Sequence, residues 1–144
     1  GEGDRGGDKV YPKGGKGVIS LEKAKKLKEA GLVWEPQEGD LVYHSEAEDY
    51  FYITTDDMED YVQATRIDKE YAYSIAIFLP RLDQLLAEIE KRGYKWFLET
   101  DRETYFIRII KPGDTKEPVS FKAYAKSLVD AAASALLWIY ERRK

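Results

Sequence analysis

The second half of the chain changes from helical to strand periodicity and back again, and this order constrains the fold more than any other feature. Apolar residues first recur at the spacing of one helical face, at Leu82, Leu85, Leu86 and Ile89. Aromatic and β-branched segments follow at 94–100, 104–111 and 119–124, and they predict three strands. A long alanine-rich helix is expected over 126–141. Because consecutive strands are joined by short turns, the order predicts an α+β fold: an antiparallel sheet with two helices on one face, α-β-β-β-α.

The first half predicts a helix and several short strands ahead of this unit. Ser20 is a suitable N-cap for a helix that ends at Gly31, since serine can accept from a free N–H of the first turn. Extended segments are expected at 41–44, 50–55, 61–65 and 70–79, where aromatic and β-branched residues are frequent. Pro80 ends the last strand and precedes the helix that starts the second half.

Glycine content divides the chain of 144 residues into an arm and a domain. Seven of the eleven glycines fall within residues 1–17, a segment with almost nothing to bury, so we expect a flexible arm there. Residues 18–144 are expected to form a single α+β domain with its core in 79–141. Within that core, Leu86 and Leu136 are expected at the centre of the helix–sheet contacts.

Composition excludes several classes of site. The chain has no cysteine, which excludes disulfides, thiol nucleophiles and cysteine-ligated zinc. It has one histidine, His44, which we expect to be an ordinary residue at the surface or at a sheet edge. The acids at 56–60 lack EF-hand spacing, so a solvated acidic surface is favoured over a Ca²⁺ or Mg²⁺ site. We therefore expect no metal, no cofactor and no catalytic residue.

Strand alternation identifies one candidate binding surface in the second half. Side chains alternate between the two faces of a sheet, so placing the apolar positions of each strand toward the helices turns the intervening positions outward. The outward set comprises three cations and three aromatic rings: Lys95, Phe97, Phe106, Arg108, Lys122 and Tyr124. Aromatic rings stack on bases and cations neutralise phosphates, so this set suits a nucleotide-like ligand. The alternative is that residues 41–78 or a second subunit cover this face.

The chain resembles a known family in the segments that carry this pattern. They are LPRLDQLLAEIEKRGYKWFLE at 79–99, the aromatic strand that follows, and the alanine-rich helix that ends ALLWIY at 135–140. These segments are similar to the phage ABA sandwich domain, a family of small proteins of phages and prophages of Gram-positive bacteria. The resemblance implies a phage origin and an α+β sandwich, and it assigns no catalytic residue.

The resemblance itself implies no function, but two functions are considered for a small phage protein without catalytic chemistry. By analogy of size and origin, the chain is expected to bind and sequester a nucleotide-like immune signal of the host, as a homo-oligomer in the host cytoplasm. The alternative is an inhibitor that binds a host defence protein through the same sheet face or through residues 35–70. That segment carries twelve acids and two bases. No apolar run approaches the length of a membrane span, so no membrane partner is expected.

Overall fold

The computed structural model describes residues 17–33, 35, 37–53, 75–113 and 119–142. The elements in this part of the chain are, in order, α1 (Leu21–Ala30), β1 (Leu41–His44), β2 (Asp49–Tyr52), β3 (Ala76–Leu79), α4 (Leu82–Lys91), β4 (Lys95–Asp101), β5 (Thr104–Lys111), β6 (Val119–Ala125) and α5 (Leu128–Arg142). Helices and antiparallel sheets are segregated along the chain, so the fold class is α+β, as the sequence predicts.

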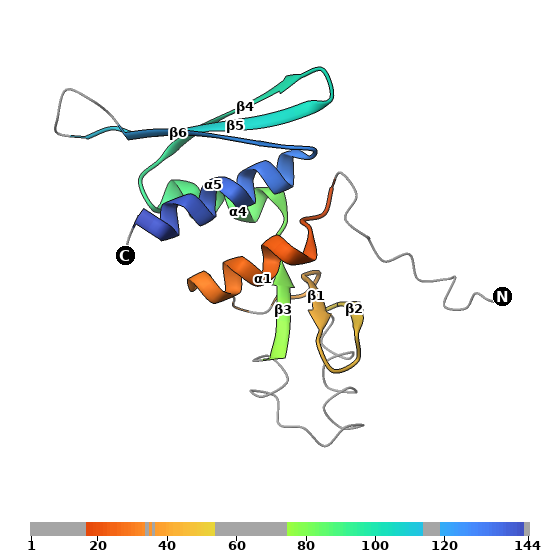
Figure 1. The fold of residues 1–144 in the computed structure, drawn as a ribbon. Helices are drawn as coiled ribbons and strands as arrows, with labels where there is room; N and C mark the ends of the chain where they lie inside the picture. The colour runs from red at the N-terminus through yellow and green to blue at the C-terminus, as the bar shows by residue number, and fades with distance from the viewer. Residues whose placement is uncertain (1–16, 34, 36, 54–74, 114–118, 143–144) are drawn as a thin grey trace.

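The helices lie between two small sheets (Figure 1). One antiparallel sheet has the order β4-β5-β6, and α4 and α5 pack on one of its faces. On the far side of α5 lies α1, which in turn packs against β3 of the second sheet, of order β2-β1-β3. The predicted α-β-β-β-α unit is therefore present, and α1 joins it to the short strands of the first half.

Helix α1 begins and ends where the sequence predicts. The Ser20 hydroxyl accepts a hydrogen bond from the Lys23 N–H at 3.3 Å, which caps the first turn. Gly31 adopts a left-handed φ of 107° at the C-terminal end, a conformation that costs glycine little. Ala24 and Leu27 are buried, and they form the apolar stripe that packs against α5 and β3.

In helix α4 the buried leucine is not the one expected from the sequence. Leu85 and Ile89 are fully buried, whereas Leu86 is only half-buried. The expectation that Leu86 lies at the centre of the helix–sheet contacts is therefore wrong. The physical reason is that α4 packs against α5 as well as against β4, so its buried stripe is centred on Leu85.

Helix α5 is the central helix, and its alanines explain how it is packed on several sides. It contacts α1, α4, β5 and β6. Most of its side chains are buried, including four small ones that let neighbouring elements approach closely: Ala131, Ala132, Ala133 and Ala135. Leu136 is fully buried among them, as predicted. None of the helices in the described part of the chain has the length and hydropathy of a membrane span.

In the second sheet, β1 is the central strand. It pairs antiparallel with β2 on one side and with β3 on the other, and its bounds match the predicted segment 41–44. Strand β2 overlaps the start of the predicted segment 50–55, and β3 is the end of the predicted segment 70–79. The predicted strand 61–65, and residues 1–16 of the predicted arm, lie outside the described residues.

A buried carboxylate connects the first strand to the start of α4. Asp40 is 1% exposed and precedes β1. Its carboxylate accepts hydrogen bonds from the Gln37 N–H at 3.0 Å and from Gln84 Nε2 at 3.1 Å. Arg81 Nη1 lies 3.3 Å away and makes an ion pair with it. These donors come from two separate segments, so one side chain fixes the loop before β1 against α4.

A second long-range hydrogen bond connects the two ends of the domain. The Ser20 N–H, at the start of α1, donates to Asp130 Oδ1 at 2.8 Å, across 110 positions of sequence. Asp130 lies in the first turn of α5, where its own N–H donates to the Ser127 hydroxyl at 3.1 Å. A carboxylate near the N-terminal ends of two helices complements both helix dipoles. The start of α1 is therefore fixed to the start of α5.

Candidate ligand-binding face

The register of the β4-β5-β6 sheet brings the predicted site residues together on one face. Phe97 of β4 lies opposite Arg108 of β5, and Arg108 lies opposite Lys122 of β6. In the neighbouring row, Phe106 lies opposite Tyr124. The sixth residue, Lys95, lies one row further along β4. We call this side of the sheet, away from α4 and α5, the outer face, and these six the outer-face residues.

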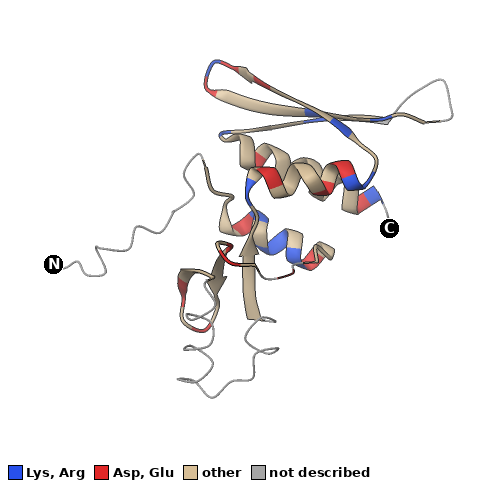
Figure 2. Cartoon of the chain, turned by 180° about the vertical axis from the view of Figure 1, so that it is seen from behind, with Lys and Arg blue, Asp and Glu red and all other residues tan. Residues whose placement is uncertain are grey.

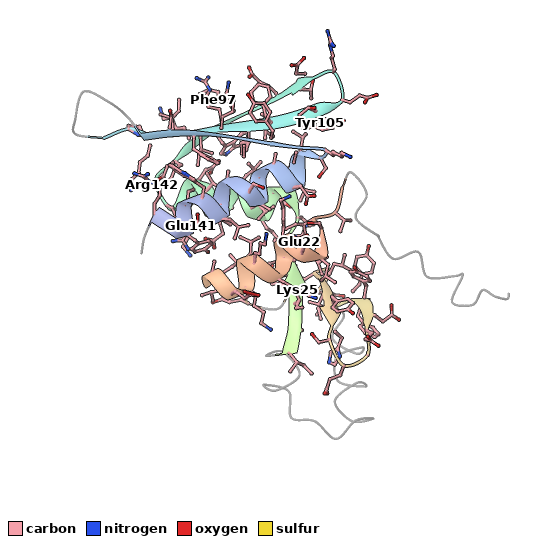
Figure 3. All side chains as sticks on the ribbon, viewed as in Figure 1. Glu22, Lys25, Phe97, Tyr105, Glu141 and Arg142 are labelled. Carbon is pink, nitrogen blue, oxygen red and sulfur yellow. The ribbon has the colours of Figure 1, made fainter. Side chains whose placement is uncertain are left out.

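Burial confirms which side of the sheet faces the helices. Ile107 and Ile109 are completely buried, and Ala123 is 5% exposed. The alternate positions are exposed: Phe97 has 43% and Tyr124 59% of its surface accessible. Figure 3 shows the Phe97 side chain standing on the side of the sheet opposite α5. The strand alternation read from the sequence therefore predicts both faces of this sheet correctly.

No described segment covers the outer face. Strands β1, β2 and β3 lie beyond α1, at the opposite side of the helices from the β4-β5-β6 sheet (Figure 1). The alternative that residues 41–78 form a mixed core on the outer face is therefore wrong for the part of 41–78 that the structure describes. The physical reason is that Leu41, Ile77 and Leu79 bury their side chains in the core cluster that includes α1.

The outer-face residues contact one another in cation–π and aromatic pairs. The Arg108 guanidinium carbon lies 4.8 Å from the centre of the Phe97 ring, and Lys122 Nζ lies 5.0 Å from that of Phe106. The Phe106 and Tyr124 rings are 5.3 Å apart, with an angle of 38° between their planes. A cation over a ring gains from the quadrupole of that ring, which orients both side chains. The face is thus a continuous layer of rings and cations.

Two of these cations are also directly opposite each other. Arg108 and Lys122 are register partners on adjacent strands, and both are exposed. Like charges at directly opposite positions destabilise a sheet, because the side chains are close enough to repel. The rings of Phe97 and Phe106 offset part of this repulsion. A bound anion would neutralise the pair, so the arrangement favours anion binding.

Acidic residues are concentrated toward the β4–β5 turn. Glu99 lies in the same row as Phe106 and Tyr124, Asp101 lies opposite Thr104, and Glu103 shares the two-residue turn with Arg102. Figure 2 shows acidic and basic residues together at this turn, where the acids outnumber the one base. A phosphate is therefore attracted toward the Arg108–Lys122 row and repelled from the turn. The acids at the turn thus limit the space for a polyanion.

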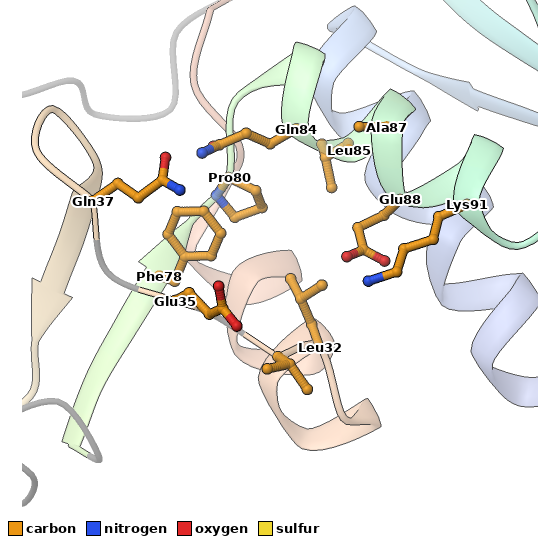
Figure 4. Close-up of a pocket in the computed structure, with 11 residues that line it drawn as sticks. Leu32, Glu35, Gln37, Phe78, Pro80, Gln84, Leu85, Ala87, Glu88 and Lys91 are labelled. Atoms are coloured by element: carbon orange, nitrogen blue, oxygen red, sulfur yellow. The ribbon is translucent and has the colours of Figure 1, made fainter.

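The outer face is open, and two hollows lie elsewhere. One, of about 360 Å³, lies between α4, β3 and the segment after α1, where Leu32, Phe78 and Leu85 form apolar walls (Figure 4). Glu88 and Lys91 of α4 line the same hollow. The other, of about 690 Å³, lies between α1 and α5. Neither of these two hollows is lined by any of the six outer-face residues.

His44 is buried, contrary to the expectation from the sequence. It is 3% exposed at the end of β1, which is a central strand and not an edge. Its Nδ1 accepts the Ala47 N–H at 3.2 Å, and its ring meets Phe51 edge-on at 6.4 Å. Burial lowers the pKa of His44, and the nearby Glu46 carboxylate partly opposes this shift. The histidine therefore supports the β1–β2 turn in its neutral form.

The stability of the fold is expected to fall on acidification because of His44. Its pKa is below the ordinary 6.5 in the folded chain, so the unfolded chain binds the proton more tightly. The contribution is fully present above pH 6.5 and is lost as the pH falls through the folded value. Denaturant unfolding of wild type and His44→Gln between pH 7.5 and 5 measures this. The wild type should lose more stability than the variant, and parallel pH profiles would contradict the assignment.

The outer face offers groups that suit binding. Its six residues provide ring surfaces for stacking and cations for phosphate. The acidic cluster at 56–60 lies outside the described residues. Asp40 was not predicted as an important residue, because only the packing of α4 against the first strand brings its donors together.

Comparison with protein-family models, with curated proteins and with solved structures finds no match for this chain.

Proposed function

We propose that this chain is a phage-encoded binding protein without catalytic activity, and that it binds and sequesters a nucleotide-like immune signal of its host. The ligand lies on the outer face, with its base against the rings and its phosphate at the Arg108–Lys122 row. We further propose that it acts in the host cytoplasm as a homo-oligomer. The proposal of a phage origin rests on the resemblance of residues 79–141 to the phage ABA sandwich domain.

A single observation carries the proposal: two exposed cations lie opposite each other between aromatic rings. The Arg108–Lys122 pair opposes folding by its repulsion, and no carboxylate lies beside it in its register row. Such a pair is explained when an anion joins it in the functional state. Exposed rings on both sides of the pair add the surface on which a base stacks.

A host defence protein is the second candidate partner. Phe97 and Tyr124 expose large apolar surfaces, 43% and 59% accessible, on the outer face. Aromatic residues and arginine are enriched at the centres of protein–protein interfaces. A protein partner would use the same face, so a titration with nucleotides separates the two candidates.

Arg108→Ala is expected to weaken nucleotide binding without weakening the fold. Its guanidinium supplies a charge-assisted contact to phosphate of about 1.5–3 kcal/mol, which is roughly ten- to a hundred-fold in affinity. An exposed arginine stabilises the fold little, and its removal relieves the repulsion with Lys122. Calorimetric titration with AMP and with cyclic diadenylate measures binding, and thermal unfolding measures stability.

Lys111→Ala is the matched control for this experiment. Lys111 is at the end of the same strand, but its Nζ lies 5.6 Å from the ring of the buried Tyr94, on the side of the helices. The same loss of charge there should leave nucleotide affinity unchanged. If no nucleotide binds the wild type, the ligand proposal fails and a host protein becomes the better candidate.

A further inference from the structure

We infer that the outer face takes a ligand with two or three bases joined by phosphodiester links, rather than a mononucleotide or a long strand. This inference deepens the proposed function and rests on it. It follows from the number of stacking positions on the face, from the position of Lys122 between them, and from the acids that end the cationic region.

The outer face has two separate stacking positions. The first is Phe97 with Arg108 over its ring, where a base can stack on the exposed plane of the guanidinium. The second is the pair of Phe106 and Tyr124, whose rings lie 5.3 Å apart. Phe97 and Tyr124 are separated by two strand spacings and one register row, so their Cα atoms are about 12 Å apart. One base is too small to use both positions.

Lys122 lies between the two stacking positions. It shares a register row with Phe97 and Arg108, the first position. Its Nζ lies 5.0 Å from the centre of the Phe106 ring, the second position. A phosphate that links two stacked bases must lie between them, and Lys122, which starts in the row of the first position and ends over the Phe106 ring of the second, can reach it. Lys122 is therefore assigned to the linking phosphate, and Arg108 supports it from the opposite strand.

The length of the ligand is limited at both ends of the face. Glu99 lies in the Phe106–Tyr124 row itself, and Asp101 and Glu103 lie beyond it, so these three acids, against the single Arg102, repel further phosphates. At the other end, Lys95 provides one more cation, but its register partner is Ile110, which has no ring. Lys95 can therefore contact a terminal or third phosphate without a further stacking position. The face suits two bases, or three with the last one unstacked.

A length series of adenine nucleotides tests the inference, because stacking depends little on which base is used. The probes are AMP, linear diadenylate, cyclic diadenylate and linear hexa-adenylate, each titrated calorimetrically into the full chain. The better of the two diadenylates should bind about five- to a hundred-fold more tightly than AMP. Hexa-adenylate should gain nothing further. The comparison of linear with cyclic diadenylate shows whether the ligand is a linear or a cyclic dinucleotide.

Two variants separate the linking phosphate from the second stacking position. Lys122→Gln should weaken diadenylate binding by about ten- to a hundred-fold and should weaken AMP binding distinctly less, because Arg108 still holds the phosphate of AMP. Tyr124→Ala should also reduce the ratio of diadenylate affinity to AMP affinity. Tyr52→Ala is the control, because Tyr52 is a similarly exposed tyrosine on the other sheet, 45% accessible.

The outcomes distinguish this inference from the proposed function. Equal affinities for AMP and both diadenylates would overturn the two-base site and leave nucleotide binding intact. Affinity that rises steadily to hexa-adenylate would overturn the length limit. Binding of no nucleotide would overturn both. Unchanged diadenylate affinity in Lys122→Gln, with a folded variant shown by its thermal unfolding, would remove Lys122 from the linking position.

Discussion

Asp40→Ala is expected to lower the free energy of unfolding by about 1–3 kcal/mol, the cost of leaving buried hydrogen-bond donors without their acceptor. The carboxylate is 1% exposed and accepts from the Gln37 N–H and from Gln84 Nε2. Its loss leaves these two donors without their acceptor and opens a space before β1, whereas the half-exposed Arg81 keeps its ion pair with Asp83. Denaturant unfolding monitored by circular dichroism measures the change.

Asp83→Ala is the control for this variant. Asp83 pairs with the same arginine, Arg81, at 3.3 Å, but 74% of its side chain is exposed. Exposed ion pairs contribute at most about 1 kcal/mol, so this change should have a small effect. Asp40→Asn retains an acceptor oxygen of the same shape and should fall between the two. Equal losses for Asp40→Ala and Asp83→Ala would show that burial of Asp40 has no energetic role.

Leu136→Ala is expected to cost about 2–5 kcal/mol in unfolding free energy. Leu136 is completely buried on α5, the helix that contacts α1, α4, β5 and β6. Neighbours on several sides prevent any one element from moving to fill the space, so the cavity remains. Urea unfolding measures the loss, and a result below 1 kcal/mol would mean that the assigned phase of α5 is wrong.

The adjacent Leu137 provides a control for this prediction. It is half-buried on the same helix and lines the hollow between α1 and α5. Leu137→Ala carries the same change of helix propensity and deletes the same atoms, but it removes less buried surface. Its cost should be distinctly smaller than that of Leu136→Ala. The comparison therefore isolates the effect of burial.

Periodicity predicts the part of the fold that is local in sequence. Strand β5 alternates between buried Ile107 and Ile109 and exposed Arg108, and this alternation alone assigns its two faces. Once two hairpins connect the strands, the register follows, and the six candidate residues come together without any knowledge of the helices. The close contact between Arg108 and Phe97 needs the structure, because ring and cation positions depend on rotamers.

The features that the sequence does not predict depend on contacts between distant segments. The local sequence does not show that His44 is buried, because its burial depends on the position of β1 between β2 and β3. It does not distinguish Asp40 from the other acids of its segment, because its partners Gln84 and Arg81 come from the start of α4. Leu86 has the same helical spacing as Leu85, and only the position of α5 decides which of them is buried.

The hydrogen bond between Ser20 and Asp130 has a consequence for how the protein is made. During synthesis α1 leaves the ribosome well before its packing partner α5, because all the strands and α4 lie between them in sequence. Until α5 emerges, Ala24 and Leu27 have no surface of α5 to pack against. The domain can therefore complete its folding only once α5 has emerged, and a chain truncated before α5 leaves its first helix as an exposed apolar surface for chaperones and proteases.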